Sequence, residues 1–177
     1  MSIYDKIYEI AADHYGLITT DEAKVIGIAN IELVKLAHRG KLQRLGHGLY
    51  RLSRYIPTSY DAYAEAVKMA GPDAYLYGES VVALHGLIPT NPSYIHVASP
   101  TRIRKKLPGH IHIIRICRHE IKVCFEGIPS QRAFNAFRVC IGSIMNERLI
   151  EAIHEARRIG IITASDEKSL MKEIKND

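Results

Sequence analysis

A short glycine-centred hairpin pattern constrains the fold of this chain more than any other feature. The stretch 41–52, KLQRLGHGLYRL, alternates apolar with polar or basic residues on both sides of Gly46-His47-Gly48. Alternation of this kind is typical of strands with one buried face, and the glycines permit a tight turn. We therefore expect a two-stranded hairpin whose leucines face inward and whose basic residues point outward.

Three helical segments precede this hairpin. Apolar residues recur at helical spacing over residues 3–15, which predicts a first helix. They recur in the same way in a third helix, which begins near Asn30 as its N-cap. Between them, a short helix begins at Thr19 or Thr20. A small residue, a turn glycine and two apolar anchors stand where a helix-turn-helix needs them, at Ala23, Gly27, Leu33 and Leu36. The order of elements predicts a winged helix-turn-helix over residues 1–56, which we expect to fold on its own, with the hairpin as its wing.

Residues 57–177 predict a second, mixed domain with a small sheet. The expected helices are 60–69, 80–85, 129–140, 146–158 and one starting near 165, and the expected strands are 74–77, 94–98, 111–117 and 122–125. The fold class of the whole chain is therefore α+β.

Positive charge is concentrated in two places. The 177 residues contain 24 Lys plus Arg and 19 Asp plus Glu, a net charge of +5. Six basic residues and no acidic one lie in 35–54, and seven basic residues accompany only Glu120 in 102–122. Clusters of this kind indicate an anionic partner. The second cluster contains a basic loop, which is either an additional contact or a solvated loop: Arg102, Arg104, Lys105 and Lys106.

For a winged helix, the expected anionic partner is double-stranded DNA. The third helix would enter the major groove, where Asn suits adenine and Arg suits guanine. The wing would contact phosphates or the minor groove. The candidate contacts are Asn30, Lys35, His38 and Arg39 on the third helix, and Lys41, Arg44, His47 and Arg51 on the wing. Thr19 and Thr20 would donate hydrogen bonds to a DNA phosphate. Glu32 opposes phosphate, so a protein-binding winged helix stays open as an alternative.

Two patterns bear on catalysis. Five potential zinc ligands crowd into one stretch without a CxxC or HExxH arrangement, and alternating strand positions would scatter them over both faces of a sheet: His110, His112, Cys117, His119 and Cys124. Asp73 after Pro72, followed by Glu120-Ile-Lys122, spells the PD…ExK pattern of Mg²⁺-dependent nucleases, but the pattern is short and the gap is long. We expect no catalytic residue, no metal and no cofactor, with a nuclease as the enzymatic alternative.

The N-terminus lacks the features of a signal peptide, and no apolar run approaches the ~20 residues of a membrane span. Three cysteines fit a reducing compartment. We expect a cytoplasmic protein without a membrane partner.

The chain resembles the AbiEi-type antitoxins of type IV toxin–antitoxin systems and related prokaryotic regulators. The likeness lies in GLITTDEA (16–23), in Gly27-Ile28 and above all in the wing, 42–51. In the second domain, LYGES (76–80) and ALHGL (83–87) are similar to the entry of that family's second domain.

The resemblance implies that the winged helix binds the protein's own promoter and that the second domain counters a nucleotidyltransferase-like toxin. One departure is visible. Relatives usually carry Arg-Thr-Leu-x-Asp where this chain has Arg132-Ala-Phe-Asn-Ala136. A standalone regulator without a toxin partner is therefore the alternative.

Overall fold

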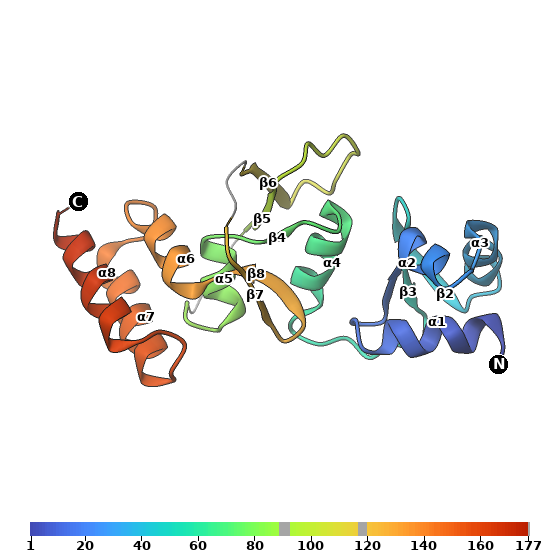
Figure 1. The fold of residues 1–177 in the computed structure, drawn as a ribbon, viewed down its shortest axis with the longest axis horizontal. Helices are drawn as coiled ribbons and strands as arrows, with labels where there is room; N and C mark the ends of the chain where they lie inside the picture. The colour runs from blue at the N-terminus through green and yellow to red at the C-terminus, as the bar shows by residue number, and fades with distance from the viewer. Residues whose placement is uncertain (89–92, 117–119, 177) are drawn as a thin grey trace. The chain divides into compact units, whose positions relative to one another are not determined.

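A computed structural model describes residues 1–88, 93–116 and 120–176, and these form two compact units, Met1–Met69 and Ala70–Asp177. Helices and strands are mixed in each unit, so the predicted α+β class is confirmed (Figure 1). Among the described residues, none of the helices has the length and apolar character that crossing a bilayer would need.

Unit 1 has the element order of a winged helix-turn-helix, as predicted. Unit 1 also contains a three-stranded antiparallel sheet in the order β1-β3-β2, whose strand β1 lies between α1 and α2 in the chain (Figure 1). Its elements are α1 (Ile3–Ala12), β1 (Leu17–Thr19), α2 (Thr20–Val25), α3 (Asn30–His38), β2 (Leu42–Gly46), β3 (Leu49–Leu52) and α4 (Asp61–Ala70). Strand β1 was not predicted, because its three residues are too few to show an alternating pattern, and Leu17 and Ile18 are both buried.

The helix-turn-helix core forms from the residues that the spacing singled out. Ala23 and Leu33 are fully buried, and Leu36 lies beside them in one cluster. Gly27 has φ +77°, a conformation that favours glycine, and it turns the chain between α2 and α3. Ile7 of α1 and Tyr50 of β3 complete the same cluster, so helices and wing share one core.

Helix α4 contacts the face of the small sheet opposite this core. Arg51 of β3 reaches Asp61 and Glu65, and Lys68 pairs with Glu22 of α2. These contacts place α4 with unit 1, thirteen residues beyond the boundary predicted at 56/57. Whether residues 1–56 fold on their own stays a prediction.

The described residues of unit 2 form a five-stranded mixed sheet, in the strand order β6-β5-β4-β8-β7, and four helices. Strands β5 and β6 run parallel, as do β4 and β8, while β4–β5 and β7–β8 are antiparallel. The strands are β4 (Tyr75–Leu76), β5 (Ile95–Ser99), β6 (Ile111–Arg115), β7 (Lys122–Phe125) and β8 (Ile128–Gln131), and the helices are α5 (Glu79–Leu84), α6 (Ala133–Cys140), α7 (Asn146–Arg158) and α8 (Ala164–Asn176).

The helix predicted over 129–140 is wrong in its first four residues. Residues 129–131 belong to β8, which pairs with β7 from Lys122 opposite Gln131 to Phe125 opposite Ile128, and Arg132 is the N-cap of α6. A proline at position 129 is compatible with the first turn of a helix and equally with a strand, and burial of the strand in the sheet decides between them. The predicted strand 111–117 ends at Arg115, and Cys117 lies outside the described residues.

Candidate nucleic-acid interface

The outward face of α3 carries the side chains predicted to contact bases. Asn30, Lys35 and His38 are exposed, and Arg39 is exposed just after the helix ends. Asn30 is not the cap that the sequence suggested, because Ala29 holds the cap position and Asn30 is the first helical residue. Its amide is therefore free of a capping role and stands at the start of the helix.

Lys35 forms an ion pair within α3. Its Nζ lies 2.7 Å from Oε1 of Glu32, one turn earlier on the same helix. Pairing neutralises both charges, so the helix presents less positive charge than a count of its basic residues suggests. Glu32, which argued against phosphate contact in the sequence, is thus compensated within the helix.

The wing keeps three of its four predicted basic contacts on the surface. Lys41, Arg44 and His47 are exposed, and His47 lies at the tip between two glycines. Gly48 has φ +70°, and a β carbon at that position would lie 2.9 Å from the Thr20 hydroxyl oxygen. The turn therefore depends on glycine at position 48 both for its backbone angle and for space.

Arg51 differs from the prediction, because its side chain is only 14% exposed and points toward α4. Its Nη2 lies 2.5 Å from a Glu65 carboxylate oxygen and 3.2 Å from one of Asp61. Two carboxylates therefore hold this guanidinium within unit 1. Arg51 lies on the face of β3 opposite Tyr50, and α4 covers that face, which the local pattern of the hairpin could not indicate.

Thr19 is also engaged within the fold. Its backbone N–H and its hydroxyl both donate to Glu22 Oε2, while its hydroxyl oxygen accepts from the Glu22 N–H at 3.1 Å. The N–H of Thr20 donates to the Gly48 carbonyl. A carboxylate thus already occupies the N-terminus of α2, where a phosphate was expected.

Glu22 stays ionised in this position. Burial favours its protonated form, but hydrogen bonds from Lys68 and from the Thr19 N–H outweigh burial and hold the pKa of Glu22 below its usual value. The cap is therefore a fixed negative charge, which argues against phosphate binding there.

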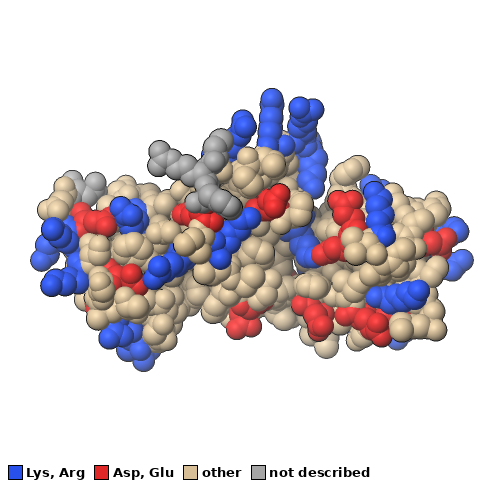
Figure 2. Space-filling model, viewed as in Figure 1, with Lys and Arg blue, Asp and Glu red and all other residues tan. Residues whose placement is uncertain are grey.

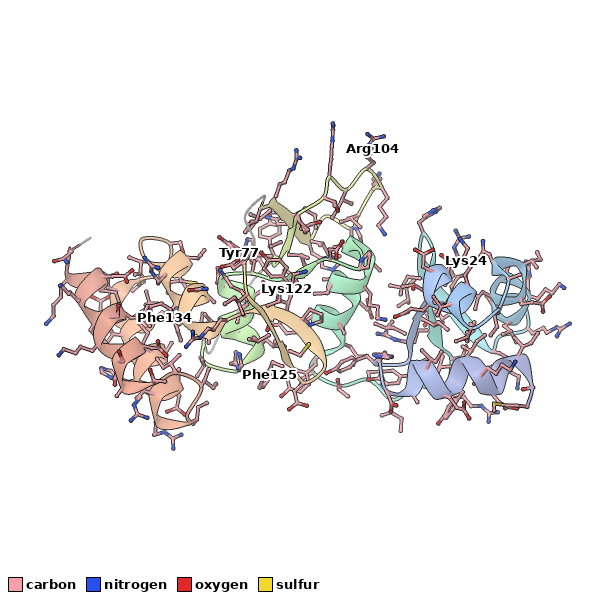
Figure 3. All side chains as sticks on the ribbon, in the orientation of Figure 1. Lys24, Tyr77, Arg104, Lys122, Phe125 and Phe134 are labelled. Carbon is pink, nitrogen blue, oxygen red and sulfur yellow. The ribbon has the colours of Figure 1, made fainter. Side chains whose placement is uncertain are left out.

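The basic loop of unit 2 connects β5 to β6 and is exposed at Arg102, Arg104, Lys105 and Lys106. Lys and Arg side chains stand out from the surface of this region (Figure 2), and Arg104 points away from the sheet (Figure 3). The described residues provide no ion-pair partner for any of the four. The loop is thus a second exposed basic surface.

The residues of the nuclease-like pattern are held by other contacts. Lys122 Nζ donates to the backbone carbonyl of Asp73 at 3.0 Å. The Glu120 carboxylate accepts from the Tyr75 hydroxyl at 3.0 Å and from Gln131 Nε2 at 2.7 Å, and Gln131 Oε1 accepts from the N–H of Gly78. These bonds tie the strand ends of unit 2 together, which is a structural role.

The potential zinc ligands of residues 110–124 are divided between the two edges of the sheet. His112 lies on β6 and Cys124 on β7, and these are the outermost strands on opposite sides. Cys117 and His119 lie outside the described residues. Within the described ranges, no group of three His, Cys, Asp or Glu side chains is placed to hold a metal ion.

Comparison with known proteins agrees with the resemblance in the N-terminal part. Residues 5–53 match the family described as "Transcriptional regulator, AbiEi antitoxin". The match runs from within α1 to just past β3, so it covers the helix-turn-helix and the wing. A search of curated proteins found no match. The predicted resemblance is thus confirmed for unit 1, and the matched family is a class of regulators rather than of enzymes.

Proposed function

We propose that the chain is a transcriptional regulator whose winged helix-turn-helix binds double-stranded operator DNA. One observation carries this proposal: α3 buries Leu33 and Leu36 while it exposes Asn30, Lys35 and His38 on the opposite face. A helix that enters the major groove needs one face anchored in the domain and another free for base edges. The match over residues 5–53 supports the same function.

Base contacts are assigned to Asn30 and Arg39, because an amide and a guanidinium each form two hydrogen bonds to one base. Ile31 is 56% exposed on the same helix and suits the methyl group of a thymine. Lys41, Arg44 and His47 on the wing would contact the backbone. Thr19 and Arg51 are given no contact in this interface, because their donors serve the fold, and the N–H of Thr20 is used by the Gly48 carbonyl.

The finer proposal is an AbiEi-like antitoxin in the cytoplasm, which represses its own promoter and counters a nucleotidyltransferase-like toxin. It rests on the family description and on the resemblance of the second domain. Arg132, which remains from the usual segment, lies 3.6 Å from Asp166, and Ala133 and Ala136 are buried. Here the segment serves the packing of α6, so the standalone regulator keeps its place as the alternative.

A gel-shift experiment with the DNA upstream of the gene, run with and without Mg²⁺, tests the proposal. The expected result is a retarded band that does not need Mg²⁺, with the DNA intact. Asn30→Ala and Arg39→Ala should reduce the preference for this DNA over a random duplex. Degradation in Mg²⁺ would favour the nuclease, and no retardation at low salt would favour a protein-binding module.

A protein-binding winged helix has one specific observation in its favour. Val25 at the end of α2 is 87% exposed, close in sequence to the exposed Ile31. Apolar side chains at such positions are suited to a protein surface. Replacing Val25 with Ser should leave DNA binding unchanged if the operator proposal holds.

The toxin proposal is tested by co-expression. If the adjacent gene encodes a nucleotidyltransferase-like protein, its expression alone should arrest growth and co-expression of this chain should restore it. Variants Asn30→Ala and Arg39→Ala should still restore growth when expressed from a foreign promoter, since protection is assigned to unit 2. If growth stays arrested when the intact chain is co-expressed, the antitoxin proposal is wrong and the standalone regulator is the function that is left.

A further inference from the structure

The strand pair β5 and β6, with the loop between them, has a composition unlike the rest of unit 2. Residues 93–116 contain five Lys and Arg, three His and no acidic residue. We call this segment the β5–β6 edge, since β6 is the outermost strand on its side of the sheet. This positive charge lies in unit 2, outside the winged helix, so DNA binding by the winged helix does not account for it.

Aromatic rings are stacked at the start of this pair of strands. The rings of Tyr94 and His112 lie 4.0 Å apart and only 22° from parallel, and His96 meets His112 edge-on at 5.6 Å. His96 and His112 are register partners in the parallel pair, so backbone pairing holds them side by side. Tyr94 is 46% exposed and His112 is exposed. The stack is therefore preformed and reachable from solvent.

The last residues of the basic loop, 108–110, lie at the start of the same two strands. The N–H of Ile95, next to Tyr94, donates to the His110 carbonyl at 2.8 Å, and the N–H of Ile111 donates to the Pro108 carbonyl at 3.0 Å. These bonds bring the end of the loop beside the stack. Cations and aromatic rings thus belong to one stretch of the chain, residues 93–116.

The loop cations form no ion pair among the described residues, in contrast to three arginines of unit 2. Arg132, Arg138 and Arg158 each pair with a carboxylate. Arg102, Arg104, Lys105 and Lys106 form no ion pair with any residue that the structure describes. Four unpaired cations in five positions repel one another, and a polyanion would relieve that repulsion.

We propose that the β5–β6 edge binds single-stranded nucleic acid. The four loop cations would contact successive phosphates, and an unpaired base would stack on the Tyr94–His112 pair. Basic grooves combined with aromatic platforms are the usual design for single strands, and each stacked base contributes about 1–3 kcal/mol. A duplex hides its bases and would leave the rings unused, and an acidic protein would use the cations alone.

The test is fluorescence anisotropy on the full chain with a labelled 12-nucleotide poly(U) or poly(dT) strand, and with a random duplex. All proteins carry Lys41→Ala and Arg44→Ala, so that the wing contributes little. The protein that carries only these two substitutions should bind the single strand several-fold more tightly than the duplex. Equal or tighter binding of the duplex, or no binding of the strand at low salt, would overturn the proposal.

Two sets of variants separate charge from stacking. Arg104→Ala, Lys105→Ala and Lys106→Ala together should weaken strand binding at least tenfold and flatten the salt dependence by about 2 units, since each phosphate contributes about 0.7. The matched control removes three exposed lysines of α8, Lys168, Lys172 and Lys175, and should change binding less than twofold. An equal loss in the control would mean that only net charge matters and would contradict the site.

Tyr94→Leu should weaken strand binding by about fivefold or more, corresponding to ~1 kcal/mol for one stacked base, with the salt slope unchanged. Tyr94→Phe keeps the ring and should retain binding. Thermal melts of both variants confirm that unit 2 is folded. Unchanged binding by folded Tyr94→Leu would overturn the stacking platform. The comparison of Tyr94 variants does not depend on the operator proposal, because α3 and the wing are identical in every protein compared.

Discussion

The Arg51 guanidinium lies 2.5 Å from the Glu65 carboxylate, and this pair connects the wing strand β3 to helix α4. Asp61 lies 3.2 Å from the same nitrogen and also accepts from the N–H and hydroxyl of Thr58 and from the Tyr55 hydroxyl. The linker after the wing is thus held by the same carboxylate that holds the wing. Arg51, which the sequence analysis predicted to contact DNA, instead holds the wing against α4.

Arg51→Ala should therefore lower the stability of unit 1 while leaving DNA contacts in place. Removing one partner of a mostly buried ion pair leaves two carboxylates without their cation, and we expect a loss of roughly 2–4 kcal/mol in the free energy of unfolding. Urea denaturation of the full chain measures it. The control Arg54→Ala removes an exposed cation nearby and should change stability by about 0.5 kcal/mol at most. Equal effects of the two would contradict the structural role of Arg51.

The same contacts predict how the chain can be shortened. A fragment 1–70 keeps α4 and should unfold at a higher temperature than a fragment 1–56, in which Arg51 has lost both carboxylates and Glu22 has lost Lys68. The shorter fragment keeps the helix-turn-helix core, so a cooperative but marginal transition is expected from its size. Circular dichroism melts compare the two. Identical melting temperatures would show that α4 does not stabilise the wing.

Salt titration separates the roles of helix and wing in DNA binding. Replacing Lys41 and Arg44 with Ala should weaken binding to operator and random DNA alike, and should flatten the salt dependence by about 1–2 units. Replacing Asn30 or Arg39 should instead reduce the difference between the two DNAs, with a smaller change of slope. Gel shifts at several salt concentrations provide the data. An unchanged slope in the Lys41/Arg44 variant would mean that the wing only covers the helices.

His85 gives the second unit a dependence on pH. Burial lowers its pKa from 6.5 to about 4, and its ring packs on Phe125 at 4.1 Å. Above pH 6.5 both folded and unfolded states are neutral at this residue. As pH falls from 6.5 to 4, the unfolded state takes up a proton that the folded state resists, so stability is lost in that window.

His85→Phe should flatten this part of the stability profile by roughly 1–3 kcal/mol, because partial exposure reduces the full effect of the shift. Urea unfolding at pH 7, 6 and 5 measures it. His47→Asn, at the exposed tip of the wing, is the control and should keep the wild-type profile. A His85→Phe profile parallel to the wild type would show that this histidine is not the cause.

The local pattern of the sequence was sufficient for the winged helix. Helical spacing identified the anchors Leu33 and Leu36, a turn glycine marked position 27, and alternation around two glycines marked the hairpin. All of these depend on neighbours within a few residues, where backbone geometry decides the outcome. The family resemblance rested on the same stretch, and residues 5–53 are where it is confirmed.

Tertiary structure alone decided which charges remain available. Arg51 and Arg44 look alike in the sequence, yet Arg51 is held by α4 and Arg44 is exposed. Strand β8 was hidden for the same reason, since its pairing with β7 and β4 is a property of the sheet. Ion pairs and sheet edges join segments that are distant along the chain, and periodicity carries no information about which segments will meet.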